Sequence, residues 1–532
     1  MLKCNLAASG VVALLLLSAC GDEAAEQQQA QDNAAESAVT AIDPAQAPVI
    51  QKGIEEYLAL MEGPADQRVV HHKAVKVTPG SDAFDVAIEG VEIGSQGEDR
   101  LDVGTVTYRL TPKDADGFVA SDLKHAAKFP FLKADGKEEG YVSLTTKSFT
   151  GDWSSDLQSF LALDWQAADI VVKDETAGGG DMRAAGMSAS LTSADKGNGI
   201  FDQQGLFGVT GFSVKDTSGG TMEVAKLAGT FGINAVKLKE YVAKAREMQT
   251  LTAEIAEAAS KAEVQSSTEG ETMASPAITP EQAQKLGGII KSMSGLIGGI
   301  TYAFDFENVT YKEADGSQPF SLKAGNFDLG FSGLDAEKAK VDFGIGHDGL
   351  AINDPEVTAT PLLAKLMPAQ GSLALTLSDV PSKELWTLIG DQFPTLIAGD
   401  QGQAEAAMNV MIMSLGELLQ KSPMKLDVGP SGLAAEILQV AAQGAFDVRP
   451  EAMFGLIGAL DVDVHGLDEA MKMATEAAQN SPEAAQVVGS LAMIQSLAKR
   501  ETSGDGKPVD KLKIEVDATG DTKVNGVSLS GM

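Results

Sequence analysis

Five histidines are the first candidates for acid–base or metal chemistry in this sequence: His71, His72, His125, His347 and His465. Only His71 and His72 are close in sequence. Consecutive side chains on a strand point to opposite faces, so this pair is poorly arranged to bind one metal ion. No His-Glu-x-x-His motif is present. We therefore predict solvated or capping roles for the histidines.

Motifs for nucleophilic and phosphate-binding chemistry are incomplete. Gly186–Ser190 and Gly526–Ser530 begin like the Gly-x-Ser-x-Gly elbow of serine hydrolases, but both lack the final glycine. Ser503–Lys507 lacks the Walker spacing of a phosphate-binding loop. The sequence therefore offers no serine nucleophile or phosphate cradle of a known pattern.

One short acidic segment resembles a calcium loop in composition only. Asp195, Asn198 and Asp202 offer oxygen ligands, yet the EF-hand spacing and its closing glutamate are missing. Carboxylates are so numerous elsewhere that no pair can be chosen as general acid and base. We therefore predict a protein that is not an enzyme, with no catalytic residues, no metal site and no cofactor.

Cysteine chemistry is confined to the first 20 residues, which contain both cysteines, Cys4 and Cys20. An apolar run over residues 6–17 is typical of a secretory signal and too short to span a membrane. Residues 17–20, Leu-Ser-Ala-Cys, match the bacterial lipobox, which implies cleavage before the cysteine and acylation of its thiol and amine. We therefore predict that Cys20 is the lipidated first residue of the mature chain and that its acyl chains attach it to a membrane.

Charge limits the partners and extends the prediction of location. The chain has 75 Asp and Glu against 41 Lys and Arg, a formal net charge of -34, so a nucleic-acid partner is excluded. Gly21 follows Cys20 where an aspartate would signal retention in the inner membrane. We expect a lipoprotein facing the periplasm, at the outer membrane rather than the inner one. Residues 22–49 contain acids but no Lys or Arg, which is typical of a disordered tether.

Alternation of apolar and polar residues at period two begins near Ala83, for example at Phe84, Val86 and Ile88, and predicts antiparallel strands with one wet face. A strand–turn–strand pattern recurs in the segments Ile170–Gly186, Phe212–Phe231 and Val309–Phe327. A hairpin unit used several times would produce this repeat. The alternative, that amphipathic hairpins with acidic glycine turns simply look alike, stays open.

Apolar residues at three- and four-residue spacing predict helices between the strands. The predicted helices cover residues 238–262, 281–297, 382–393, 403–420, 467–478 and 482–497. Ser481 is the expected N-cap of the last helix, with Pro482 at its first position. We expect the helices over 281–297 and 403–420 to lie against the concave face of the sheet as core. If they fill it only partly, its Leu, Ile and Met lining would suit an acyl chain.

The predicted fold class is α+β: an extended, twisted antiparallel β-sheet built of repeated hairpins, with amphipathic helices packed on one face. We divide the chain into five segments. These are a signal peptide over 1–19, an acidic disordered tether over 20–49, an N-terminal sheet half ending in a long helix over 50–262, a polar linker over 263–279, and a C-terminal sheet half with helices over 280–532.

Several segments resemble an uncharacterised group of Gram-negative envelope proteins, the domain of unknown function 2125 family. The resemblance rests on Phe304–Tyr311, Pro361–Pro368, Ser372–Pro381 and Ala459–Val464, and it covers about residues 80–530. That family has no established activity, so the resemblance implies no catalytic residues. The predicted sheet is also similar in general form to the long curved sheets of periplasmic lipid-handling proteins of the AsmA type.

These observations lead to three hypotheses about function. The first is a non-catalytic envelope protein that binds or shields a hydrophobic, lipid-like molecule. The second is a structural or interaction module that contacts other envelope proteins. The third, a hydrolase, has the least support, because no nucleophile elbow, metal cluster or thiol survives in the mature sequence.

Overall fold

The computed structural model of the protein describes residues 42–62, 70–94, 99–114, 116–176, 180–266, 278–353, 361–398, 401–450, 452, 455–479, 481–504 and 506–529. Strands account for 53% of the structure and helices for 27%. The chain divides into two compact units. Unit 1 lies within residues 1–219, 226–298 and 389–407, and unit 2 lies within residues 220–225, 299–388 and 408–532.

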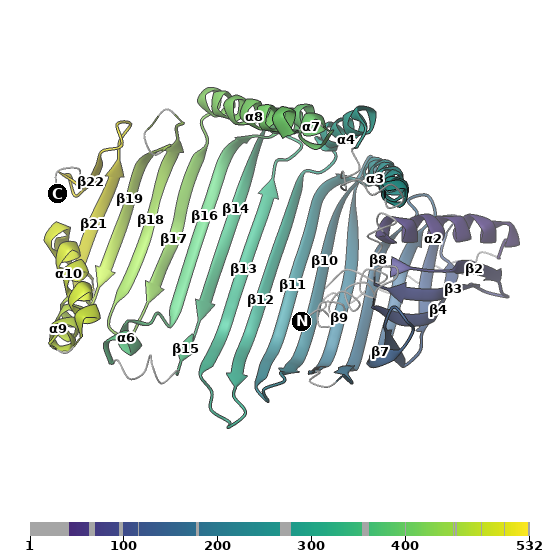
Figure 1. Cartoon of the computed structure of the whole chain (residues 1–532), viewed down its shortest axis with the longest axis horizontal. Coiled ribbons are helices and arrows are strands. Elements are labelled where there is room, and N and C mark those ends of the chain that lie inside the picture. Colours follow the sequence, from purple (N-terminus) through teal and green to yellow (C-terminus); the bar gives the residue numbers. More distant parts are fainter. Residues whose placement is uncertain are drawn as a thin grey trace, which may run out of the picture. The chain divides into compact units, whose positions relative to one another are not determined.

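Unit 1 is built on antiparallel strands, in the order β2, β3, β4, β5, β7, β8, β9, β10 (Figure 1). Short β1 also pairs with β3, and β6 pairs with both β4 and β7. The strands are β1 (Val70–His71), β2 (Ala74–Pro79), β3 (Phe84–Ile93), β4 (Arg100–Pro112), β5 (Gly117–Lys124), β6 (Lys128–Leu132), β7 (Glu138–Ser154), β8 (Ser159–Asp174), β9 (Asp181–Gly197), β10 (Ile200–Lys215) and most of β11 (Thr221–Lys237).

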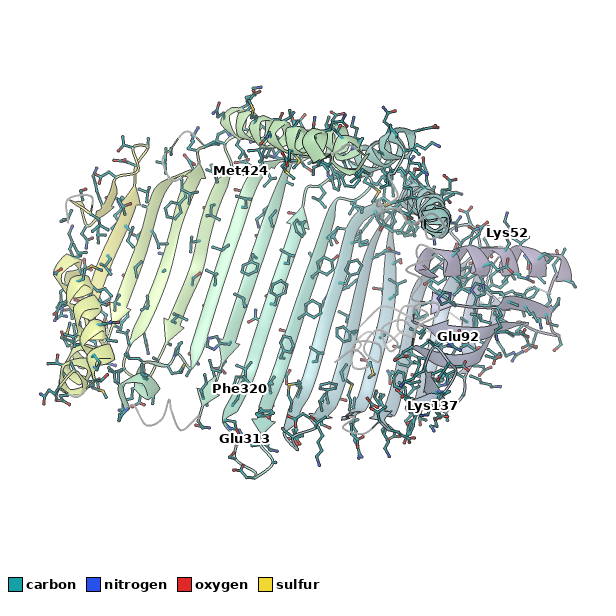
Figure 2. All side chains as sticks on the ribbon, viewed as in Figure 1. Lys52, Glu92, Lys137, Glu313, Phe320 and Met424 are labelled. Atoms are coloured by element: carbon teal, nitrogen blue, oxygen red, sulfur yellow. The ribbon has the colours of Figure 1, made fainter. Side chains whose placement is uncertain are left out.

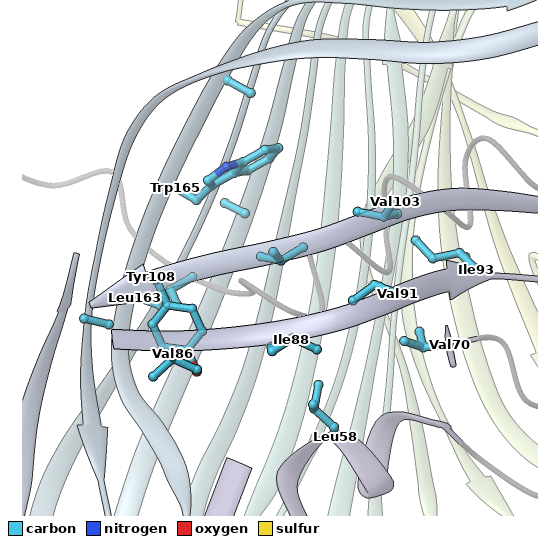
Figure 3. Close-up of a cluster of buried hydrophobic side chains, with 14 of the residues drawn as sticks. Leu58, Val70, Val86, Ile88, Val91, Ile93, Val103, Tyr108, Leu163 and Trp165 are labelled. Atoms are coloured by element: carbon cyan, nitrogen blue, oxygen red, sulfur yellow. The ribbon is translucent and has the colours of Figure 1, made fainter. Parts of the chain in front are cut away.

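Helix α2 (Ala47–Glu62) closes the core of unit 1, after a short 3-10 turn, η1 (Pro44–Gln46). Its Ile50, Ile54 and Leu58 recur every four residues, so they share one helix face, and each is at most 2% exposed. Alternate residues of β3 and β4 meet this face, and Figure 3 shows Leu58 gathered with Val86 and Ile88. Burial of these apolar side chains on both elements is what stabilises the unit.

Three further helices supply residues to a smaller cluster in unit 1: α3 (Leu238–Ser266), α4 (Pro280–Met293) and α7 (Ser382–Ala398). Leu251, Leu286 and Ile289 are buried in it against Phe393 and Ile397. Helix α4 begins with a capping box, in which the Thr279 hydroxyl accepts from the Gln282 amide and the Gln282 side chain accepts from the Thr279 amide.

Unit 2 contains a second run of antiparallel strands, in the order β12, β13, β14, β16, β17, β18, β19, β21, β22, β23. Short β15 pairs with β13 and β20 with β21. The strands are β12 (Gly299–Lys312), β13 (Phe320–Ser332), β14 (Lys338–Asp348), β15 (Ala351–Ile352), β16 (Gln370–Pro381), β17 (Lys425–Ala434), β18 (Gln439–Val448), β19 (Leu456–His465), β20 (Lys499–Thr502), β21 (Pro508–Val516), β22 (Thr522–Val524) and β23 (Val527–Ser528).

The helices of unit 2 connect strands or cover one corner of the sheet. Helices α9 (Leu467–Ala477), α10 (Pro482–Leu497) and α6 (Pro361–Leu366) contribute to one buried cluster with the last strands. Helix α8 (Gln401–Lys421), which unit 2 holds from Met408 on, lies along the ends of β14, β16 and β17 (Figure 1).

The predicted α+β class is therefore wrong, although the antiparallel strands are confirmed. The chain is mainly β, and its helices are too few to cover one face of the sheet. Helix α8 runs across strand ends with apolar side chains in solvent, and α4 packs against α3 and α7 instead of lying on a sheet. Strands of 10–14 residues in unit 2 present more apolar surface than α9 and α10 contact.

Local predictions survive this correction. Ser481 caps α10 by accepting from the Ala484 amide at 3.2 Å, and Pro482 occupies its first position. The three predicted strand–turn–strand segments cross from β8 to β9, from β10 to β11 and from β12 to β13. Each turn has an aspartate carboxylate that accepts the backbone amide two residues further on: Asp174 from Thr176, Asp216 from Ser218 and Asp315 from Ser317.

The difference between the two units predicts different costs of truncation. Phe84, fully buried in unit 1, packs edge-on against Phe118 with ring centroids 5.9 Å apart, whereas Leu373 of unit 2 is 39% exposed. Phe84→Ala should lower the free energy of unfolding by about 3–5 kcal/mol, and Leu373→Ala by about 1 kcal/mol or less. Urea unfolding followed by tryptophan fluorescence and circular dichroism checks this, and equal losses would contradict it.

Candidate functional site

The histidines lie in different surroundings, although His347 and His465 line one groove of the unit 2 sheet. His71 Nε2 lies 3.1 Å from the Gly94 carbonyl oxygen, and His125 Nε2 lies 2.7 Å from the Thr146 hydroxyl. His347 is on β14 and His465 at the end of β19, while His72 follows β1. Among the described residues, no three His, Cys, Asp or Glu side chains come together as a metal-binding group.

The other sequence candidates are structural in their described contacts. Ser188 lies within β9 opposite Gly208, and the Ser503 hydroxyl donates to the Lys507 carbonyl in the turn before β21. In the segment that resembled a calcium loop, Asp195 accepts the Gly197 amide at 2.6 Å. The carboxylate of Asp202 pairs with Lys196 at 2.8 Å, and hydrogen bonding from Lys196 lowers the pKa of Asp202. This loop is a hairpin turn whose acids already have protein partners.

Cys20, the signal segment 1–19 and the tether up to residue 41 lie outside the described residues, as does most of the linker, over 267–277. Lipidation of Cys20 therefore stays a prediction. Across the part of the chain that the structure describes, every helix is too short or too polar to cross a bilayer.

Unit 1 has an aromatic-lined cavity beneath α2. Its volume is about 40 Å³, and its walls include Tyr57, Tyr108, Trp153 and Trp165. The Trp153 indole N–H is buried without a hydrogen-bond partner, and burial raises the pKa of Tyr108. A space of this size holds a water molecule or two rather than an acyl chain, so we regard it as part of the core.

The largest unusual feature is one side of the unit 2 sheet, which we call the apolar face. Residues two apart on a strand share a side, and strand register aligns them in four rows. The first row is Ile300, Phe331, Val341, Leu377, Leu426 and Phe446; the second is Tyr302, Leu329, Phe343, Leu375 and Val428; the third is Phe304, Phe327, Ile345 and Leu373; the fourth is Phe306, Gly325, His347, Gly371 and Leu433.

Contacts between rings confirm that these side chains meet on one side. The Phe304 and Phe327 ring centroids are 6.5 Å apart, and Phe327 meets Phe343 edge-on at 5.7 Å. Such pairs contribute beyond their buried area, yet they do not bury the face. Every residue of the four rows is half-buried or exposed; Ile345 is 47% exposed and Leu433 52%.

The opposite side of the same strands is polar, which explains how a single layer remains in water. Its residues alternate with those of the apolar face; one row holds Thr301, Gly330, Asp342, Thr376 and Asp427. The Asp342 carboxylate accepts from the Thr376 hydroxyl at 2.7 Å and pairs with Lys340 at 2.8 Å. Burial raises the pKa of Asp342, but the Lys340 and Thr376 hydrogen bonds outweigh it and leave that pKa below its usual value.

Among the described residues of unit 2, helices cover only the last strands of the apolar face. There Val464 of β19 is 3% exposed beneath α9 and α10, with Val440 and Leu512 packed at its side. Arg500 holds this corner together by donating both to Asp510 of β21, at 2.8 and 2.9 Å, and to Asp468 of α9, at 2.9 and 3.0 Å. Figure 2 shows the strands from β12 to β17 with side chains that no other described element of the unit lies over.

The uncovered surface is large for a water-soluble sheet. With strands about 4.8 Å apart and about 3.4 Å per residue, β12 to β18 present a strip about 24 Å wide and about 20 Å long. Exposed apolar patches on monomeric proteins rarely exceed a few hundred Å², and larger ones mark binding surfaces or membrane contact. The side chains of the four rows are apolar apart from the Tyr302 hydroxyl and the His347 ring, so the strip offers few hydrogen-bonding groups.

No family model, no curated protein and no solved structure matches this chain.

The helices over 281–297 and 403–420 were expected to lie against the concave face of the sheet as core, with a partly filled groove as the alternative. In the structure the apolar surface lies on the strands, and its residues are half-buried or exposed. The signal was present in the alternation Ile300, Tyr302, Phe304, Phe306 and its partner strands. Alternation reveals which residues share a face but not whether another element covers that face.

An open apolar face predicts dye binding by the folded, delipidated protein. 1-Anilinonaphthalene-8-sulfonate should fluoresce with the native protein, because it reports exposed hydrophobic surface. The double variant Phe327→Ser/Phe343→Ser should reduce this signal to about half or less, while Thr301→Ser/Thr376→Ser, on the polar side, should not. Unchanged circular dichroism is the control for folding. No fluorescence with the wild type, or equal fluorescence from all three proteins, would contradict an open face.

Proposed function

We propose that this protein is a lipid-anchored envelope lipoprotein that binds or shields a lipid-like molecule on the apolar face of unit 2, without catalysing a reaction. The observation that supports the proposal is that no described element of unit 2 covers the four rows of apolar side chains on that face. Each apolar side chain that a ligand covers fully would contribute about 1.5–3 kcal/mol. Water alone offers no such gain, so the exposed face has a strong preference for hydrocarbon.

The chemistry of the face favours an acyl chain over a polar ligand. Its side chains are those of Phe, Leu, Ile and Val, with one tyrosine and one histidine, His347. The His347 Nδ1 atom is buried without a hydrogen-bond partner, while the residue lines a groove together with Gly371 and Leu433. A peptide bound here would leave backbone amides unpaired, at a cost that a hydrocarbon avoids.

The predicted address agrees with this function. An acylated Cys20 would hold the chain at the periplasmic side of a membrane, the outer one by the residue that follows the cysteine, where lipid-like molecules are the abundant hydrophobic ligands. The net charge of -34 opposes adhesion of the acidic surfaces of the protein to anionic head groups. An apolar face on a strongly acidic protein can then take up single molecules without the whole surface adhering to the membrane.

Matched substitutions on the two sides of the unit 2 sheet test the proposal. Ile345 and Leu373 are register partners on the apolar face, whereas Ser372 and Thr301 are exposed on the polar side. After gentle extraction, mass spectrometry should detect lipid bound to the wild type and to Thr301→Glu/Ser372→Glu. Ile345→Glu/Leu373→Glu should retain at least about tenfold less, because buried charge is costly in hydrocarbon.

Two results would contradict the proposal. The first is a wild-type protein that carries no lipid and transfers none between vesicles. The second is equal lipid on both double variants. The alternative function, an interaction module of the envelope, gains support instead if crosslinking in cells from the apolar face captures one reproducible protein and no lipid.

A further inference from the structure

Between Met408 and Leu415, the side of helix α8 that faces solvent is mainly apolar, the reverse of an ordinary surface helix. Met408, Val410, Ile412, Met413 and Leu415 are 43%, 46%, 60%, 69% and 37% exposed. The residues turned inward are smaller or no more apolar: Ala404, Ala407, Met411, Ser414 and Leu418 are half-buried or buried. A helix that served only to connect β16 and β17 would place charges outward.

The exposed apolar residues occupy a broad arc. At about 100° per residue, the five exposed apolar residues between positions 408 and 415 are spread over about 220° of the helix circumference, with the exposed amide of Asn409 among them. A groove on a partner protein, or a paired helix, contacts a stripe of about 100°. An arc twice that width fits the acyl chains of a lipid layer, which can contact the helix from several directions at once.

Charge and length fit a bilayer surface. No charged residue occurs between Glu405 and Glu417, a distance of about 18 Å along the axis. This is shorter than the hydrocarbon core, which is about 30 Å thick, so the segment can lie in the interface but cannot span it. Glu417 and Lys421, which pair with each other at 3.7 Å, mark the end of the apolar stretch.

The helix is also continuous with the apolar face. Helix α8 ends at Lys421 and β17 begins at Lys425, so Leu426 of the first row lies five residues beyond the helix. Leu377, its register partner on β16, lies in the same row at the strand ends that α8 crosses (Figure 1). Hydrocarbon in contact with α8 would therefore be close to the first row of the face.

We propose that α8 docks on the surface of a lipid bilayer through the Met408–Leu415 arc and places the first row of the apolar face at the membrane surface. The role that we give to this docking rests on the proposed function, because docking would let an acyl chain pass between the bilayer and the sheet without crossing water. The occupant of the arc is a lipid surface rather than a second copy of the chain.

Vesicle flotation tests the docking. The probe is neutral phosphatidylcholine and phosphatidylethanolamine vesicles, which remove charge effects, and the protein is the chain beginning at Gly21, which keeps every described residue and lacks Cys20. Wild type should float with vesicles. Ile412→Glu/Met413→Glu should bind at least about tenfold more weakly, because inserting two apolar side chains contributes more than a tenfold change in partitioning. Thr301→Glu/Ser372→Glu, which adds the same charge to exposed positions on the polar side of the unit 2 sheet, is the matched control and should bind like the wild type.

Parallel measurements separate this inference from the proposed function. Binding of a fluorescent fatty acid in solution should be the same for Ile412→Glu/Met413→Glu as for the wild type, which also shows that the variant is folded. Failure of the wild type to float, or equal flotation of all three proteins, would overturn the docking of α8. So would a wild-type dimer that Ile412→Glu/Met413→Glu dissociates. Flotation that depends on α8 without any fatty-acid binding would leave the docking intact and contradict the proposed function instead.

Discussion

A β-sheet has two sides, and alternation along each strand decides what each side presents to its surroundings. Unit 1 buries its apolar side in the usual way: α2 and the strands cover Phe84, Ile54 and Trp165 almost completely. Unit 2 has the same alternation but leaves its apolar side in contact with solvent over most of its width. Its polar side, with Asp342, Thr376 and Lys340 in one network, keeps the layer in water. The uncovered apolar side is the constraint on which the proposed function depends.

The position of the helices follows from that constraint. Helices α9 and α10 cover only the last strands, where Arg500 ties Asp468 to the buried carboxylate of Asp510. Removing one member of such a pair leaves a buried charge without its partner, so the corner is fixed, whereas the strands from β12 to β17 remain open. Helix α8 stands at the strand ends with its apolar arc outward. The exposed face and the exposed arc are two apolar surfaces of one unit, and we propose that hydrocarbon covers both.

Periodicity was sufficient to predict most local structure. The long helix from Leu238 and the cap at Ser481 depend on residues close in sequence. Helix α2 was not predicted, and its Ile50, Ile54 and Leu58 reveal their role only when β3 and β4 are brought beneath them. Helix α8 shows the limit most clearly. Its apolar residues were expected to form core, yet Met408, Ile412 and Leu415 are exposed while Ala407 is buried. What covers a face is decided by tertiary contacts that no local pattern records.

The most direct test is to ask what touches each side of the sheet in the cell. Leu373 and Ser372 are consecutive residues of β16 on opposite sides, both exposed. A photocrosslinking amino acid placed at Leu373 should form an adduct with the mass of a lipid, detected by mass spectrometry of the purified protein, and the same amino acid at Ser372 should not. Equal lipid labelling at both positions, or labelling of the Leu373 position by protein alone, would contradict lipid binding on the apolar face.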